Sequence, residues 1–170
     1  MAEQATKPVT VDLIEEYLDK FGWKAHEDVP EPDEKEGVVM TGWRGLGDEG
    51  HPLVIDPIVE KGALLFKAIR VAQAPPDDTA ADRLNGLLLA MSALNFKYIL
   101  GGWAYDPRDG EVAFKVGMPV DSDDLDYKDF EHCLNVVVMA VEADGPSLKA
   151  VLDGSKTAQE ILESEKMQGT

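Results

Sequence analysis

The chain has 170 residues, 44% of them hydrophobic, which is typical of a globular domain and excludes a disordered chain. Asp and Glu number 33 against 16 Lys and Arg, so the net charge is -17. Such a charge repels nucleic-acid phosphates and anionic lipid surfaces, and the sequence has no basic run to offset it. We therefore expect no nucleic-acid or membrane partner, and the acidity favours either solubility or a basic protein partner.

The cellular location follows from the cysteine content and the apolar runs. Cys133 is the single cysteine, so an internal disulfide is excluded, which fits a reducing compartment. The first residues are polar and acidic and differ from a secretory signal. The longest apolar runs, 86–90 and 136–141, are too short to span a bilayer. We expect a cytoplasmic protein.

The first predicted element is a helix. Thr10 begins it, the apolar residues of 13–21 share one helical face, and Gly22 ends it. Residues 23–29 are compatible with a short strand. Residues 30–37, rich in Pro and acidic side chains, predict a solvated loop.

Three strands follow, predicted over residues 38–44, 53–60 and 63–71. The last two are joined through residues 61–62, which is typical of a hairpin. Pro57 interrupts the second strand, and we expect it at an edge or a bulge because proline donates no hydrogen bond to a neighbouring strand.

The segment "APPDD" separates these strands from a middle helix. Asp77 or Asp78 is predicted to cap this helix, which runs to about Asn95. Its main apolar stripe is Leu84, Leu87, Leu88, Met91 and Leu94 or Asn95. Leu89, Ala90 and Ala93 are apolar as well, so more than one side of the helix is expected to be covered. The sheet covers one side, and a second helix or a second subunit covers the other.

The stretch "GGWAYDPRDGEVAFKV" predicts a hairpin. Pairing Asp106 with Glu111 leaves a four-residue loop that contains Pro, Asp and Gly, as tight turns favour. The expected pairs are Tyr105 with Val112, Trp103 with Phe114, Gly101 with Val116, and Ile99 with Met118. One face is then apolar and aromatic, and the other is made mostly of small residues that permit close approach by another element, including a partner subunit.

A final helix is predicted from about Asp124 to Ala143, and Gly145-Pro146 is expected to end it. Residues 147–153 predict a short further helix. The remainder is polar, with a frayed helix through Ile161 and Leu162. We divide the chain into a flexible N-terminus at 1–9, one domain at 10–154 and a polar tail at 155–170. The order of helix, three strands, helix, two strands, helix predicts an α+β fold with a mostly antiparallel sheet.

Two motifs that resemble ligand sites are better explained as a connection between strands and as the start of a helix. Residues 45–50 match the glycine fingerprint of dinucleotide sites, but a strand follows where that fingerprint needs a helix. Residues 121–132 fail the calcium-loop pattern at Leu125, Asp126 and His132. Acidic residues at a helix start are already explained by the helix dipole.

No catalytic, metal or cofactor site is expected from the sequence. His26, His51 and His132 form no paired motif with carboxylates. Cys133 falls on the apolar stripe of the last helix and is interpreted as a buried core thiol.

The candidate binding residues are apolar side chains on strands and on the middle helix. For an extended peptide they are Val38, Met40, Trp43, Leu53 and Ile55, with ordinary core packing as the alternative. For a dimer interface they are Leu87, Leu88, Met91, Leu94, Gly102 and Ala104.

Three stretches resemble the YbjN family, whose fold is like that of class I type III secretion chaperones. They are "LIEEYLDKFGW", the Leu94-Asn95 helix end, and the hairpin "GGWAYDPRDGEVAFKVGMPV" with its Met118-Pro119 lead into the last helix. The resemblance spans about residues 10–154. It implies a chaperone-like α+β fold, and chaperones of that fold are small, acidic dimers that hold an extended segment of a partner.

The resulting hypothesis is a non-enzymatic, homodimeric protein-binding module that holds an extended segment of a protein or peptide partner. One alternative is a regulatory or signalling adaptor that recognises a folded partner surface. An enzyme or small-ligand protein is a further alternative, which needs a concave pocket with convergent polar groups.

Overall fold

The computed structural model describes residues 9–30, 37–45, 49–58, 62–120 and 125–168, with the side chains of 166–168 excepted. Its elements, in chain order, are α1 (Val11–Phe21), β1 (Glu27–Val29), β2 (Val38–Arg44), β3 (Gly50–Ile58), β4 (Ala63–Gln73), α2 (Ala81–Asn95), β5 (Gly102–Asp106), β6 (Glu111–Pro119), α3 (Tyr127–Asp153) and α4 (Ala158–Gln168).

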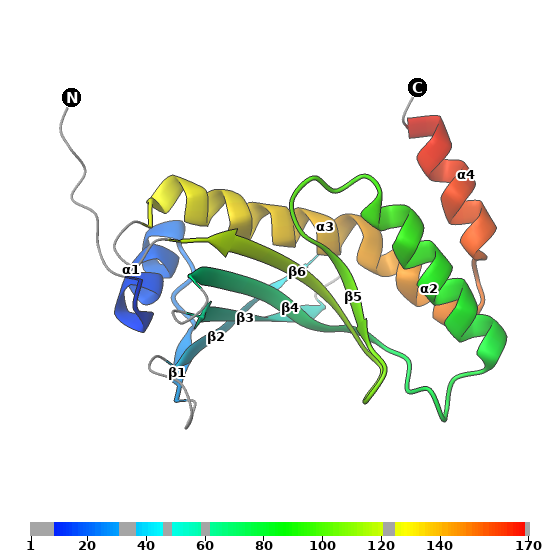
Figure 1. Ribbon diagram of the computed structural model, residues 1–170, viewed down its shortest axis with the longest axis horizontal. Helices are drawn as coiled ribbons and strands as arrows, with labels where there is room; N and C mark the ends of the chain where they lie inside the picture. The colour runs from blue at the N-terminus through cyan, green and yellow to red at the C-terminus, as the bar shows by residue number, and fades with distance from the viewer. Residues whose placement is uncertain (1–8, 31–36, 46–48, 59–61, 121–124, 169–170) are drawn as a thin grey trace.

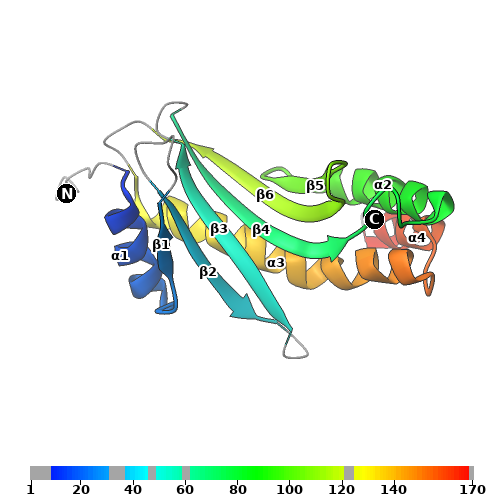
Figure 2. The ribbon, with the colours of Figure 1, turned by 90° about the horizontal axis from the view of Figure 1, so that it is seen from below.

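The strands form one six-stranded sheet in the order β1-β2-β3-β4-β6-β5, and every neighbouring pair is antiparallel. The predicted α+β class is confirmed. Figure 1 shows α3 running along one face of the sheet, with α1 at the β1 end and α2 and α4 at the β5 end. Figure 2 shows the opposite face, which none of the described helices covers.

The core lies between the sheet and α3. Along β4, Leu64, Phe66 and Ala68 are fully buried while the residues between them are partly exposed, as a strand with one covered face requires. Phe66 packs against Phe130 of α3 with ring centroids 5.2 Å apart. Each large side chain buried in this way contributes about 1.5–3 kcal/mol.

The bounds of α1 agree with the sequence prediction. Thr10 accepts a hydrogen bond from the backbone N–H of Leu13 at 3.2 Å, and Gly22 ends the helix with a φ of 99°. The helix is tied to α3 through Tyr17, whose ring meets those of Tyr127 and Phe130 edge-on.

The predicted start of α2 was wrong. The helix begins at Ala81, and its N-cap residue, Ala80, makes no side-chain cap bond. The backbone N–H groups of Asp78 and Thr79 bond instead to the carbonyl of Pro75. This separate turn uses the segment that was expected to cap the helix.

The predicted end of α3 at Gly145-Pro146 was also wrong, because the helix continues to Asp153. Leu148 and Val151 extend its buried stripe, so packing outweighs the hydrogen bond that Pro146 cannot donate. Pro146 itself is exposed, which keeps its ring out of the core. Gly145 is buried at a close approach, where an added Cβ would lie 3.2 Å from Val71 Cγ1.

The C-terminal segment that we predicted as a polar tail forms α4. Ala158 and Ile161 are buried, and the helix packs against α2. Helices α3 and α4 of the same chain thus pack against α2, while its Leu88 and Leu89 remain 39% and 52% exposed.

Pro57 lies in β3, an inner strand of the sheet, so the expected edge position holds only locally. Pairing of β3 with β2 ends at Ile55, and Pro57 pairs with Leu64 of β4 alone. Pro52 is the mirror case, because it pairs with Gly42 of β2 and precedes the pairing with β4. Each proline thus lies where one neighbouring strand is absent from the ladder.

The β2–β3 connection confirms the structural interpretation of the glycine motif. Arg44 pairs with Gly50 in an antiparallel hairpin, so no helix follows the glycines; residues 46–48 lie outside the described part. The calcium-loop candidate is likewise a helix start, with Asp126 accepting from the N–H of Lys128, although residues 121–124 lie outside the described part.

The β5–β6 hairpin has the predicted register, with Asp106 opposite Glu111 and Trp103 opposite Phe114. Pairing ends at Gly102 and Lys115, so the expected Gly101–Val116 and Ile99–Met118 pairs do not form. At Gly101 the chain turns away from β6 with a φ of 82°, and a Cβ there would lie 2.6 Å from the carbonyl oxygen of Lys115.

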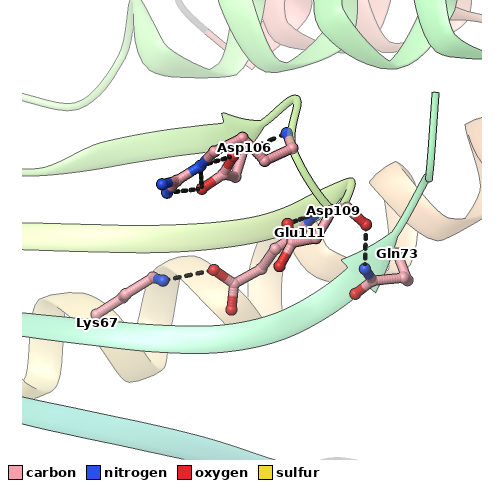
Figure 3. Close-up of polar contacts among 6 residues, drawn as sticks. Lys67, Gln73, Asp106, Asp109 and Glu111 are labelled. Carbon is pink, nitrogen blue, oxygen red and sulfur yellow. Dashed lines mark hydrogen bonds and ion pairs between the residues drawn. The ribbon is translucent and has the colours of Figure 1, made fainter.

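The acidic residues of this hairpin serve the turn. Arg108 pairs with Asp106 at 2.6 Å and holds the pKa of that carboxyl below its usual range. Asp109 accepts from the N–H of Glu111 through its side chain and from Gln73 through its carbonyl (Figure 3). The carboxylates of Asp106 and Asp109 thus accept hydrogen bonds from other residues of the same hairpin.

Gly110 offers a test of the hairpin. Its φ is 78°, and a Cβ would lie 2.3 Å from the backbone of Ala74 and Pro75. Gly110→Ala is expected to lower the free energy of unfolding by about 2–5 kcal/mol through the left-handed conformation and the clash. Gly117→Ala, where a Cβ meets nothing within 4 Å, is the control and should change it by less than about 1 kcal/mol in urea unfolding. An equal loss of unfolding free energy in the two variants would contradict the assignment of strain and a clash to position 110.

Candidate functional site

The peptide-binding residues predicted from sequence divide between the two faces of the sheet. Leu53 and Ile55 have no exposed surface and face the helices, as Trp43 of β2 does by register. Met40 lies on the other face and is partly exposed, next to the buried Val38. The structure does not bring the five residues together into one groove.

The predicted dimer residues are also dispersed. Leu87, Met91 and Leu94 are buried in the core of the chain, whereas Leu88 retains 39% of its exposure. Gly102 and Ala104, which were predicted for the same interface, lie on β5 and are partly buried. Exposed apolar surface on α2 is therefore concentrated at Leu88 and its neighbour Leu89, which is 52% exposed.

A surface that the sequence did not predict lies where β6 extends beyond β5 (Figures 1 and 2). Gly117 and Pro119 pair with β4 on one side, and on the other side none of the described strands reaches them. Val120 donates its N–H to Gly62 on the β4 side. The backbone N–H and C=O groups of successive strand residues point alternately to the two neighbouring strands. Since the N–H of Val120 points to the β4 side, the N–H and C=O of Gly117, three residues earlier, point to the open side.

This free edge borders a groove against α3, which we call the edge groove. It consists of two adjoining hollows that share Leu100 and His132. The first, of about 250 Å³, is also lined by Gly117, Met118, Pro119, Val120, Leu125, Asp126, Asp129 and Cys133. The second, of about 400 Å³, is also lined by Lys97, Tyr98, Ile99, Val136, Met139, Ala140 and Ala143. Most of this lining is apolar.

Large apolar side chains beside the second hollow are open to solvent. Ile99 is fully exposed and Met139 is 70% exposed, and Phe96 just before the loop is 96% exposed. Exposed apolar residues that gather at one place often mark an interaction site. The exposure of Ile99 was not predicted, because Ile99 was expected to pair with Met118 in the hairpin.

The loop that walls the edge groove is held by a buried carboxylate on α3. Asp144, 4% exposed, accepts hydrogen bonds from Lys97 Nζ at 2.8 Å, Tyr98 Oη at 2.5 Å and Trp103 Nε1 at 3.3 Å. Lys97 also reaches Glu165 of α4 at 3.2 Å. A buried charge is tolerated when it is paired and hydrogen-bonded in this way.

This network shifts the pKa values of its members. Burial raises the pKa of the Tyr98 phenol well above its usual range, and its bond to Asp144 adds to the shift. Burial opposes the charge of Lys97, but the hydrogen bonds and negative charges of Asp144 and Glu165 together outweigh burial and raise the pKa of Lys97. In the groove itself, burial raises the pKa of the Cys133 thiol to about 11, which agrees with the predicted core thiol.

The outer edge of β5 is closed, in contrast to that of β6. The side chain of Asn95, at the end of α2, accepts from the backbone N–H of Trp103 at 2.6 Å and donates to its carbonyl at 3.0 Å. These bonds satisfy both backbone groups that another strand would use. Asn95 therefore blocks strand addition at the centre of β5.

Two further surface features have polar character. Trp43 donates to Glu142 of α3 at 2.8 Å and stacks on Trp23, while His51 lies 3.6 Å from the same carboxylate. On the open sheet face, Lys67 pairs with Glu111 beside a hollow of about 190 Å³ (Figure 3). The first arrangement rests on a hydrogen bond and the second on an ion pair, and each links separate elements of the fold.

The described residues contain no cluster of three or more His, Cys, Asp or Glu side chains placed to hold a metal ion. In the same part of the chain, no helix combines the length and the apolar character needed to cross a membrane.

Comparison with known proteins identifies the family to which the chain belongs. The YbjN family, described as "putative bacterial sensory transduction regulator", matches residues 10–150, and the chain belongs to this family. No curated protein matches its sequence. The resemblance expected from the sequence is thereby confirmed.

Two solved structures share the fold. "YbjN, a putative transcription regulator from E. coli" superposes with a TM-score of 0.58 at 14% identity, over 84% of this chain and 96% of that one. An uncharacterised protein from Methanothermobacter thermautotrophicus gives 0.53 at 12% identity, over 86% and 99%. At these identities the likeness concerns the fold alone.

The Asp144 network is expected to make the free energy of unfolding decrease at alkaline pH, through Tyr98. Tyr98 binds its proton more tightly when folded, so its contribution is complete below the unfolded pKa of about 10 and is lost as pH rises above it. Tyr98→Phe is expected to lower the free energy of unfolding by about 1–3 kcal/mol at pH 7. This deficit should shrink above about pH 10 in urea unfolding. A deficit that is the same at every pH would contradict the assignment.

Proposed function

We propose that this protein is a non-enzymatic, cytoplasmic, regulatory protein-binding module that holds an extended segment of a partner in the edge groove. The observation that carries the proposal is the free end of β6 beside an apolar wall. The family description as a regulator supports it. No cofactor takes part in the proposed function.

The groove has the two components that strand addition requires. Outward backbone groups at Gly117 supply hydrogen bonds that do not depend on the partner's sequence, and the hollows receive alternate side chains that do. Edge strands that are open in this way also invite aggregation. A net charge of -17 opposes that self-association.

The alternative from sequence, an adaptor for a folded surface, draws support from Phe96 and Ile99, which project into solvent beside the groove. The two functions differ in what they need from the partner. An adaptor requires a folded partner and does not depend on hydrogen bonds from the Gly117 backbone. Strand addition requires an extended segment and depends on those hydrogen bonds.

The proposal is tested by removing one backbone donor at the edge. Gly117→Pro deletes the outward N–H, whereas the control Gly117→Ala keeps it and adds a Cβ into open space. With fluorescent peptides captured from an extended-segment library, Gly117→Pro should weaken binding about tenfold or more, and Gly117→Ala should bind like the parent. Equal binding by both variants, with unchanged thermal unfolding, would contradict strand addition.

The apolar wall has a separate test. Met139 is mostly exposed, so Met139→Lys is expected to leave the fold intact while it places a charge in the second hollow. Binding of the same peptides, measured by fluorescence anisotropy, should fall about tenfold or more. Lys128, exposed on the same helix, provides the control Lys128→Met. Full binding by Met139→Lys would exclude the second hollow from the site.

The homodimer predicted from the sequence remains a proposal, now centred on the exposed Leu88 and Leu89 of α2. Sedimentation equilibrium at micromolar concentration should show a dimer, and a double Leu88→Glu, Leu89→Glu variant should be monomeric because a dimer would bury the added charges. A parent protein that sediments only as a monomer would contradict it.

A further inference from the structure

The first hollow of the edge groove combines apolar walls with an acidic rim. Met118, Leu125 and Cys133 form its inner lining, and Leu125 and Cys133 are less than 5% exposed. Asp126 and Asp129 lie at its opening, at the start of α3. Asp126 caps α3 by accepting a hydrogen bond from the N–H of Lys128, and Asp129 is exposed, so Asp129 is the more accessible of the two carboxylates.

Such a hollow suits a long cationic side chain better than a purely apolar one. Lys and Arg bury their methylene stems against apolar surface and keep the charged group in water or near a carboxylate. A volume of about 250 Å³ accommodates one such side chain, with its charged end at Asp126 and Asp129. An aliphatic side chain would fill the inner part but would make no ion pair with the exposed Asp129 at the rim.

The second hollow has a different character. Leu100, Val136, Met139 and Ala140 line it, and its single lysine, Lys97, is already paired with Asp144 and with Glu165. It suits a large aliphatic or aromatic side chain. Residues two apart in a strand point to the same side about 6.6–6.8 Å apart, a spacing suited to adjoining hollows.

We infer that the edge groove recognises an extended segment in which a large apolar residue and a Lys or Arg occupy alternate positions, with the cationic residue in the hollow between β6 and the start of α3. The inference rests on the proposed function, because it assigns the partner of the same groove. The net charge of -17 favours the same occupant over a second copy of this chain, which would bring equal negative charge to the edge.

The test compares three peptides that differ at one position. They share an apolar residue two positions away and carry Arg, norleucine or Glu at the test position, so norleucine keeps the apolar stem without the charge. With the full chain, the Arg peptide should bind about fivefold or more tightly than the norleucine peptide, and the Glu peptide more weakly than both. The gap between Arg and norleucine should narrow as salt rises from about 0.05 to 0.5 M.

Variants of Asp129 locate the charge recognition. Asp129→Asn should reduce the preference for Arg over norleucine, and Asp129→Lys should reverse the order of the Arg and Glu peptides. Asp77→Asn makes the same change in net charge at an exposed residue outside the groove, and it should keep the full preference for Arg. Thermal unfolding of each variant checks that α3 remains folded.

The outcomes separate this inference from the proposed function. If the Arg and norleucine peptides bind equally and Gly117→Pro weakens both, the groove is confirmed as a strand-addition site and the cationic assignment is overturned. If no peptide binds, both proposals fail. If peptides instead compete with a dimer that Gly117→Pro abolishes, the edge belongs to a second copy, and the inference is overturned as well.

Discussion

The hydrogen bonds of Asp144 are the constraint on which the arrangement of the groove depends. They draw Lys97 and Tyr98 toward α3, so the chain reaches the sheet only at Gly102. β5 is consequently shorter than β6, and the end of β6 keeps a free side. The same bonds hold the loop containing Leu100 as one wall of the edge groove. A buried carboxylate is costly to desolvate, and its three donors offset that cost.

The outer edge of β5 and the free end of β6 differ in whether their backbone groups are hydrogen-bonded. At Trp103 the amide of Asn95 replaces a neighbouring strand, whereas at Gly117 the backbone remains open beside apolar side chains. With the edge of β5 closed at Trp103, only a short stretch of β6 is open to the proposed strand addition. The net charge of -17 opposes self-association, and the proposed cationic segment would complement it.

Local patterns in the sequence were sufficient for most of the fold. The Thr10 cap and the Asp106–Glu111 register depend on near neighbours in the chain, and both were predicted. The continuation of α3 through Gly145 was not, because it depends on packing against Val71, which is distant in sequence. The edge groove was missed for the same reason. It arises where Tyr98 meets Asp144, 46 residues further along, and no local pattern encodes that contact.

The most direct measurement is amide hydrogen exchange at Gly117, followed residue by residue by NMR with and without a bound peptide. If an extended segment adds to β6, its carbonyl accepts from this outward N–H, and exchange at Gly117 should slow about tenfold or more on binding. The N–H of Met118, which points to β4, should change far less. Unchanged exchange at Gly117 under saturating peptide would contradict the account.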